Sequence, residues 1–302
     1  MSPALHLLLP LFLSAAPAGK TNDADGRRPV QELYQAMDGL AKSGPWTVET
    51  VYEDEGLPIR VLRTEKKGPA LWLLAGIHGE EPAPPNAVSL STADISALAV
   101  QGIPVVVFPL GNPAGYSKGW RYPDADERGK GHSVGDSDSR LLDKDGKPRA
   151  AQPASPQSAA LTGKVLELAR QYPPLLSVDL HEDDHLPAGY VYSQGPRGCS
   201  DPAAQAVLRR MAELEYPIKR SGKTDFDEEI KDGVICGVED GSIDELISAR
   251  RVFRDGRVQE GPSGRSVIVV ETSSMKMGLA RRVRLHRAII RMLPELFKAA
   301  GK

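Results

Sequence analysis

The sequence of 302 residues lacks an excess of charge of either sign. It contains 38 Lys and Arg residues against 40 Asp and Glu residues, which gives a formal net charge of −2 at pH 7. Because nucleic-acid binding depends on lysine and arginine that neutralise phosphates, this balance argues against DNA or RNA as a partner. Aromatic residues make up only 5% of the chain, whereas there are 29 Gly and 25 Pro. We therefore expect an aliphatic core and many loops.

Cysteine is also scarce, since the chain has only Cys199 and Cys236. Two cysteines cannot build a disulfide-rich scaffold. Neither belongs to a Cys-x-x-Cys pair, so a thiolate zinc site is not supported. Two interpretations stay open: a pair of partly buried thiols, or a single disulfide that an oxidising compartment would permit.

Long apolar runs are missing except at the N-terminus. Leu5–Ala16 is almost wholly apolar, and Ala16-Pro-Ala18 matches the small-x-small pattern that signal peptidases accept, although no Lys or Arg precedes the run. The run is too short to span a bilayer. We therefore expect residues 1–18 to be a cleaved signal peptide and the protein to be periplasmic or secreted, with no stable membrane anchor.

From residue 29 onward, strand and helix patterns alternate. A hairpin is predicted over residues 46–63, and helices are predicted to begin near residues 29, 155, 202 and 281. Apolar runs of buried-strand length cover Leu71–Ile77, Pro104–Leu110, Leu175–Leu180 and Ser266–Val270. This alternation predicts an α/β fold, with a mixed, largely parallel twisted sheet and helices on both faces, in a single domain over residues 29–300. Residues 118–157 lack periodicity, and such a long loop is typical of a functional segment.

Histidine and glutamate follow three of these strands at the edge where α/β sheets bind ligands. His78 and Glu81 come after the first apolar run, His181 after the third and Glu271 after the fourth. One helical turn would place His78 and Glu81 on the same face. A set of two histidines and one glutamate is typical of a catalytic zinc site with one open position. The pattern predicts one zinc ion per chain, with Glu271 left to accept a proton from the zinc-bound water.

Several motifs then resemble, in the right order, those of the zinc carboxypeptidase family, the carboxypeptidase A-like metallopeptidases. The motifs that carry the ligands are Gly76-Ile-His78-Gly-Glu-Glu81, Ser177-Val-Asp-Leu-His181 and Ile268-Val-Val-Glu271-Thr. Gly111-Asn-Pro-Ala-Gly115, Gly119-Trp-Arg121 and Gly241-Ser-Ile-Asp244 are similar to further family segments. The resemblance spans roughly residues 71–275 and implies a zinc carboxypeptidase-like fold that hydrolyses a peptide or small amide substrate.

The resemblance implies a role for each matching residue. His78, Glu81 and His181 would be the zinc ligands, and Glu271 the general base that later protonates the leaving amine. Arg121 would help to stabilise the oxyanion, where fixed positive charge contributes most. Asp136 aligns with a family aspartate that orients the first zinc histidine.

One segment departs from the family pattern. The family commonly has Asp-Leu-Asn-Arg where this chain has Asp136-Ser-Asp-Ser139, so the Asn-Arg pair that binds a terminal carboxylate is absent. Arg140 and Arg128 are candidates to replace it. Asp138 adds an anion, and the acidic run Glu182-Asp-Asp184 follows the zinc histidine. If these residues line the cleft, they favour a substrate with a cationic group near the cleaved bond, such as a peptidoglycan stem peptide.

Three functions remain open at this point. The first is an exported zinc-dependent metallopeptidase. The second is a deacylase of small N-acyl amino acids, similar to succinylglutamate desuccinylase and aspartoacylase, which share the ligand plan. The third is a catalytically silent zinc-binding module, which has no need to keep Glu271 beside three ligands.

Overall fold

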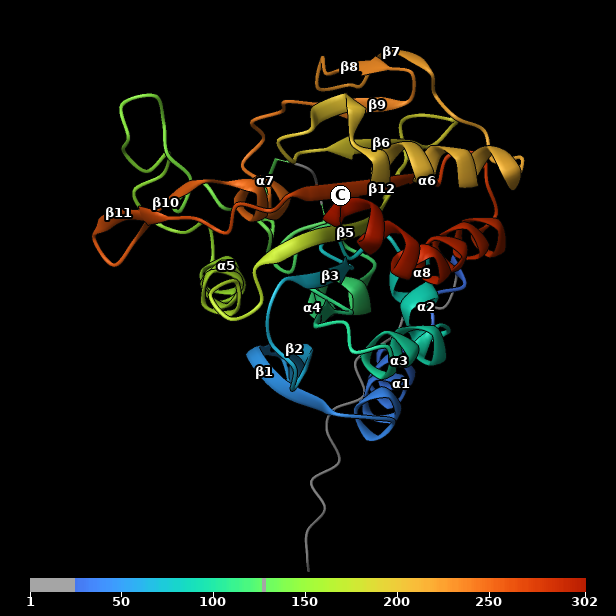
Figure 1. Cartoon of the computed structure of the whole chain (residues 1–302), viewed down its shortest axis with the longest axis horizontal. Coiled ribbons are helices and arrows are strands. Elements are labelled where there is room, and N and C mark those ends of the chain that lie inside the picture. Colours follow the sequence, from blue (N-terminus) through green and yellow to red (C-terminus); the bar gives the residue numbers. More distant parts are fainter. Residues whose placement is uncertain (1–24, 127–128) are drawn as a thin grey trace, which may run out of the picture.

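The computed structural model describes residues 25–126 and 129–302, and within them the chain forms twelve strands and eight α-helices (Figure 1). The strands are β1 (Trp46–Asp54), β2 (Leu57–Thr64), β3 (Ala70–Ala75), β4 (Val105–Phe108), β5 (Pro174–Asp183), β6 (Tyr190–Ser193), β7 (Ser221–Lys223), β8 (Glu229–Lys231), β9 (Val234–Cys236), β10 (Arg251–Arg254), β11 (Arg257–Glu260) and β12 (Ser266–Ser273). The helices are α1 (Val30–Lys42), α2 (Ala83–Ser89), α3 (Thr92–Val100), α4 (Pro113–Lys118), α5 (Pro156–Leu168), α6 (Pro202–Glu213), α7 (Ile243–Ser248) and α8 (Leu279–Gly301), with a 3₁₀ turn η2 (Gly198–Ser200).

Ten strands form one mixed sheet in the order β1-β2-β4-β3-β5-β12-β6-β9-β8-β7. The four central strands, β4, β3, β5 and β12, run parallel, and the antiparallel hairpins β1–β2 and β7–β8 lie at the two edges. The central four are the apolar runs of the sequence, and β3 and β4 are buried throughout because both of their faces are covered. The predicted mixed sheet is confirmed.

Helices cover both faces of this sheet (Figure 1). Because side chains alternate along a strand, Leu73 and Val178 face a core shared with α1, α2, α3, α6 and α8, whereas Trp72 and Val267 face a second core with α5 and α7. The predicted covering of both faces is therefore also confirmed.

The local signals in the sequence explain where the helices begin. Ser155 and Ser158 form a reciprocal capping box at the start of α5, and Asp201 caps α6 by accepting a hydrogen bond from the backbone of Ala203. Proline occupies the first position of both helices. Between α4 and α5, residues 119–155 contain no regular helix or strand where the structure describes them, as the missing periodicity predicts.

The predicted signal peptide, residues 1–18, lies outside the described residues. In the described part of the chain, no helix is both long enough and apolar enough to cross a bilayer.

The two cysteines form a disulfide, Cys199–Cys236, which joins η2 to β9 and decides between the two interpretations left open by the sequence.

Candidate active site

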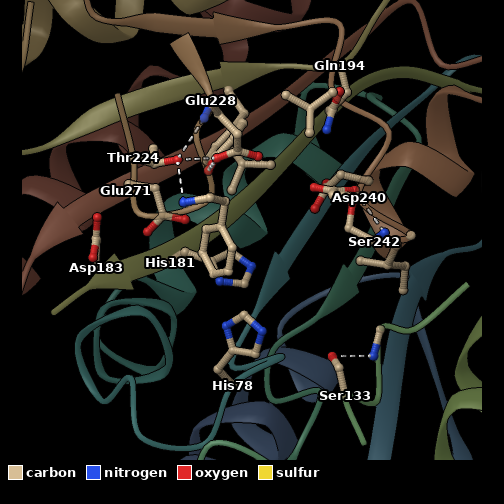
Figure 2. Close-up of a pocket in the computed structure, with 18 of the residues that line it drawn as sticks. His78, Ser133, His181, Asp183, Gln194, Thr224, Glu228, Asp240, Ser242 and Glu271 are labelled. Carbon is tan, nitrogen blue, oxygen red and sulfur yellow. Dashed lines mark hydrogen bonds between the residues drawn. The ribbon is translucent and has the colours of Figure 1, made fainter. Parts of the chain in front are cut away.

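A cavity of about 550 Å³ opens where β3, β5 and β12 end, and Figure 2 shows the side chains around it. All four residues predicted from the strand ends, His78, Glu81, His181 and Glu271, line this cavity. The parallel registers of β3 with β5 and of β5 with β12 bring them to one edge of the sheet.

Close backbone packing fixes the loop that carries His78 and Glu81. A Cβ atom on Gly79 would lie 2.2 Å from the carbonyl carbon of Gly115 and 2.3 Å from the backbone nitrogen of Tyr116, so only glycine fits there. The guanidinium of the buried Arg27 donates a hydrogen bond of 3.0 Å to the Gly79 carbonyl. The loop is therefore packed against α4 at Gly79, the residue that follows His78.

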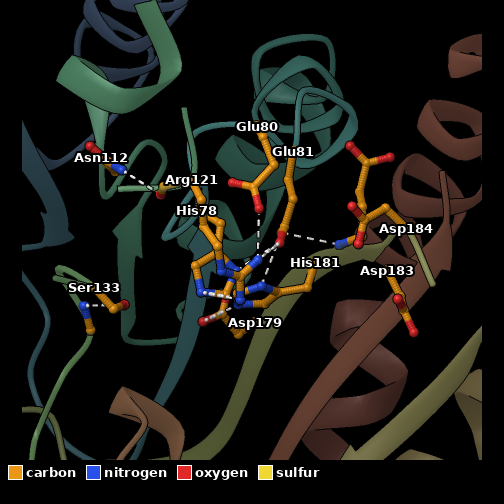
Figure 3. A network of polar contacts seen from close by, with 12 residues as sticks. His78, Glu80, Glu81, Asn112, Arg121, Ser133, Asp179, His181, Asp183 and Asp184 are labelled. Carbon is orange, nitrogen blue, oxygen red and sulfur yellow. Dashed lines mark hydrogen bonds and ion pairs between the residues drawn. The ribbon is translucent and has the colours of Figure 1, made fainter. Parts of the chain in front are cut away.

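Glu81 lies between the two histidines (Figure 3). Its Oε1 is 2.7 Å from His78 Nδ1, and its Oε2 is 3.0 Å from His181 Nδ1. The imidazole rings meet edge to face with their centroids 4.9 Å apart. Possible ligand atoms of the three residues all lie within 4.8 Å of one another. The spacing suits a single metal ion.

The electrostatics of these residues also fit a cation. Burial and the charge of Arg121 lower the pKa of His78 to about 3, so His78 is neutral, as a metal ligand must be. Burial opposes a charge on His181, but Asp179 and Glu81 raise its pKa well above the ordinary value. The carboxylates thus stabilise positive charge where the ligand atoms converge, and two imidazole nitrogens with one carboxylate suit zinc better than calcium or magnesium.

Glu271 lies beside His181 on the neighbouring strand, where the two residues pair in the parallel register of β12 and β5. Its Oε2 is buried and has no hydrogen-bond partner among the residues that the structure describes. Burial, reinforced by the negative charge of Glu81, raises its pKa well above the ordinary value of a glutamate even though His181 opposes the shift. A carboxyl group with a raised pKa and an unpaired oxygen suits proton transfer near neutral pH.

Arg121 lies in the loop after α4 and contacts the candidate ligand His78. Its Nη1 donates to Glu80 Oε1 at 2.7 Å, and its Nη2 lies 3.1 Å from His78 Nε2. Asn112 positions this loop, because its amide oxygen caps α4 while its Nδ2 donates to the Arg121 carbonyl at 3.0 Å. The Asn-Pro segment noted in the sequence therefore has a structural reason, which is to place Arg121 at the site.

This fold is shared with solved structures of named peptidases. No family model matches the sequence, and no curated protein matches it. A candidate metallopeptidase from Shewanella baltica OS155 superimposes with a TM-score of 0.72 at 21% identity, over 88% of this chain and 92% of its own. The chain has the metallo-carboxypeptidase fold.

Structures with carboxypeptidase names match over a comparable part of this chain. A metallo-carboxypeptidase from Burkholderia cenocepacia gives a TM-score of 0.61 at 11% identity, covering 90% of this chain and 70% of its own. Carboxypeptidase A from Helicoverpa armigera gives 0.59 at 12% identity, covering 92% and 74%. The predicted carboxypeptidase-like fold is confirmed, and at these identities the likeness concerns the fold.

Asp136 and Asp138 have different surroundings in the structure, since Asp136 lines the cavity and Asp138 does not. Asp136 lines the cavity and its Oδ1 accepts a hydrogen bond of 3.3 Å from the backbone of Asp138, while both nitrogens of His78 face Glu81 and Arg121. No hydrogen bond joins Asp136 to His78 among the described residues, and the predicted role of Asp136 in orienting this histidine stays a prediction. Asp138 is not among the described residues that line the cavity, because its carboxylate faces Arg149 at 3.7 Å.

Asp179, for which the sequence predicted no role, is in contact with His181 on the side away from Glu81. Asp179 Oδ2 lies 3.2 Å from His181 Nε2, so the imidazole is held between Asp179 and Glu81. Asp179 is completely buried beside Asp244 of α7, and burial together with the charge of Asp179 raises the pKa of Asp244 well above its ordinary value. Period-two alternation from His181 back to Asp179 was the signal that could have found this residue.

Of the two arginines that were candidates to replace the missing carboxylate-binding pair, the structure describes Arg140. Arg128 lies outside the described residues, and Arg140 is not among those that line the cavity.

The residues of the acidic run after His181 have different hydrogen-bond and ion-pair partners. Glu182 and Asp183 are both among the residues that line the cavity. Asp183 accepts a hydrogen bond of 2.9 Å from the Tyr190 hydroxyl, and the carboxylate of Glu182 is bound by Arg282.

The cavity wall is nevertheless strongly acidic. Ten acidic residues line it, and among the described lining residues Arg121 is the single arginine or lysine. On the wall formed by β6 and residues 224–228, Glu228 accepts hydrogen bonds from the hydroxyls of Tyr192, at 2.7 Å, and Thr224, at 2.8 Å. The expectation of an acidic cleft rested on Asp138 and the run Glu182-Asp-Asp184. Glu182 and Asp183 of that run line the cavity, and the other acidic lining residues come from other segments.

Proposed function

We propose that this protein is an exported zinc-dependent metallopeptidase whose catalytic domain covers residues 29–300 and hydrolyses a peptide or amide bond. The observation that carries the proposal is the position of Glu271, which has an unpaired buried oxygen directly beside His181. His78, Glu81 and His181 would hold one zinc ion. A binding module would not require a carboxylate with these properties at that position.

Each residue of the site has a separate role in the proposed reaction. Zinc bound there would lower the pKa of a water molecule and polarise the carbonyl of the scissile amide. Glu271 accepts a proton from the attacking water and returns it to the leaving nitrogen. Arg121, whose pKa the charges of Glu81 and Glu80 raise against the effect of burial, stays cationic and donates hydrogen bonds to the oxyanion.

The charge of the cavity favours a cationic substrate. The acidic wall would attract an ammonium group near the cleaved bond and repel a free dicarboxylate. Peptidoglycan stem peptides combine a diamino acid with an amide-linked glutamate, and we propose them as the substrate class. The small N-acylated dicarboxylates of the deacylase alternative fit this wall poorly.

Export is supported by two features. The N-terminal apolar run ends in a signal-peptidase pattern, and the disulfide Cys199–Cys236 is of the kind that persists in oxidising compartments. Expression of the full chain in a Gram-negative host tests this, and we expect the periplasmic protein to begin at residue 19 by mass spectrometry. A cytoplasmic protein of full length contradicts the proposed export.

The catalytic proposal is tested with zinc-loaded wild type and Glu271→Gln on three panels of substrates. These are defined muropeptides, peptides with free C-termini, and N-succinyl and N-acetyl amino acids, with the products weighed by mass spectrometry. We expect cleavage of muropeptides by the wild type alone. Cleavage of the N-acyl amino acids alone favours the deacylase, and no cleavage in any panel with zinc bound favours the binding module.

A further inference from the structure

The residue that directly follows His181 connects three separate elements. Strand alternation turns Glu182 to the opposite face of β5 from His181, toward α2 and α8, and it is only 4% exposed. One of its carboxylate oxygens pairs with Arg282 of α8, and the other accepts a hydrogen bond of 2.8 Å from the backbone of Ala83 at the start of α2. A single side chain thus joins β5, α2 and α8.

The main chain of Glu182 makes a second link to the same loop. Its N–H donates a hydrogen bond of 3.1 Å to Glu81 Oε2, the oxygen that also lies 3.0 Å from His181 Nδ1. Ala83 is two residues after Glu81, so Glu182 contacts the loop once through its backbone and once through its side chain. These contacts span the junction between the segment that supplies two candidate ligands, His78 and Glu81, and the strand that supplies the third.

Arg282 is the partner that permits this arrangement. It is 8% exposed, and its Nε donates a hydrogen bond of 3.0 Å to the Met277 carbonyl, which fixes the guanidinium against the residues just before α8. A buried carboxylate without a partner is strongly destabilising, whereas a buried pair whose remaining donors are satisfied is tolerated. The position of Glu182, and with it that of Ala83, therefore depends on a residue 100 positions away in the chain.

We propose that Glu182 and Arg282 are positioning residues that fix the separation between Glu81 and His181 and thereby set the affinity of the site for metal. This inference rests on the proposed metal-dependent function and adds two residues to it, neither of which would be a ligand. It gives Glu182 a role other than the attraction of a cationic substrate. Groups that orient metal ligands affect affinity strongly, typically by 10- to 100-fold when they are removed.

The test uses the full chain with Glu182→Gln, Arg282→Met and the double variant, and zinc affinity is measured by chelator competition. Each single variant leaves a buried group without its partner, so we expect the urea midpoint of the apoprotein to fall and the zinc Kd to rise about 10- to 100-fold. The double variant is neutral and close in shape. We expect it to regain most of the urea midpoint but to keep a zinc Kd about tenfold above that of the wild type.

A spectroscopic measurement separates positioning from general stability. Cobalt(II) substituted for zinc reports ligand geometry through its visible absorption, and we expect the double variant to show shifted bands. The matched control is Lys164→Met, which removes a partly buried cation that joins α5 to Glu49 of β1, away from the cavity. It should leave both the zinc Kd and the cobalt spectrum unchanged.

The outcomes distinguish this inference from the proposed function. If a folded double variant has the zinc Kd and cobalt spectrum of the wild type, Glu182 and Arg282 only stabilise the fold and the inference is overturned. If the wild type binds no zinc, the proposed function and this inference are both wrong. If the wild type binds zinc without hydrolysing any substrate, the activity is wrong, while a weakened zinc affinity in the double variant still supports the inference.

Discussion

Glu271 and His181 lie side by side on two adjacent parallel strands, at equivalent positions in the register of β12 and β5. Paired residues of neighbouring strands point to the same face of a sheet, so the glutamate lies next to the candidate ligand without being one of the three. This pairing means that the sheet, and not a loop, holds the carboxylate to which we assign the proton transfer.

Replacement of this glutamate should separate metal binding from chemistry. Glu271→Gln keeps the shape of the side chain but removes its ability to accept a proton, so we expect a loss of kcat of about 10²- to 10⁴-fold with zinc content unchanged. Steady-state kinetics on a cleaved substrate, with metal analysis of the same sample, provide the measurement. Retention of more than a tenth of the wild-type kcat would show that another group moves the proton.

Replacement of a candidate ligand should remove the metal. In His181→Ala the site loses one of its two imidazoles, so we expect about one zinc per chain in the wild type and none in the variant after dialysis against buffer with trace zinc. His185→Ala is the matched control, because His185 also lines the cavity but does not belong to the His–Glu–His group. Equal zinc content in all three proteins would place the metal elsewhere.

The sequence predicted the parts of this site that depend on strand order. His78, His181 and Glu271 were found because each follows an apolar run, and parallel strands bring such positions to one edge of a sheet. Asp179 lay inside a quoted motif but was not singled out, although its spacing from His181 places it on the same face of β5. The β1–β2 hairpin was predicted from its local pattern, but the arrangement of the other strands beyond the parallel centre, including the antiparallel pairing of β6 with β12, has no comparable local signal.

Other features could not be predicted because they depend on contacts between distant segments. Glu182 belongs to an acidic run that the sequence linked to a cationic substrate, and only the packing of α8 against β5 shows that Arg282 is its partner. Asp138 was assigned to the cleft by alignment with a family motif, whereas Arg149 holds its side chain outside the cavity. Charge patterns along a sequence do not specify which pairs become buried together.

The disulfide should contribute substantially to stability. Cys199 and Cys236 are 37 residues apart, and loop-closure entropy for a loop of that length is worth about 3 to 4 kcal/mol. We expect Cys199→Ser/Cys236→Ser to lose an amount of this order in the free energy of unfolding, measured by urea denaturation. Wild type treated with a reductant should behave like the double variant, and a loss of less than about 1 kcal/mol would contradict the chain-entropy argument.

A buried histidine should make the protein sensitive to acid. His286 of α8 is completely buried, with Nε2 3.0 Å from the Thr272 hydroxyl and Nδ1 without a partner among the described residues. Burial, together with the positive charge of Arg282, lowers its pKa from 6.5 to about 3. As the pH falls below about 6.5 the unfolded chain therefore binds a proton that the folded protein does not bind, and stability decreases until the pH reaches about 3.

The change His286→Gln tests this linkage, because glutamine can keep a hydrogen bond to Thr272 but does not titrate. We expect the variant to be less stable than the wild type at pH 7.5, where the wild-type histidine is neutral and well packed. Between pH 6 and pH 4 the stability of the wild type should fall more steeply than that of the variant, by up to about 1.4 kcal/mol per pH unit. Urea denaturation of both metal-free proteins at several pH values measures the difference, and parallel pH profiles would mean that His286 takes up its proton in the folded state as readily as in the unfolded chain.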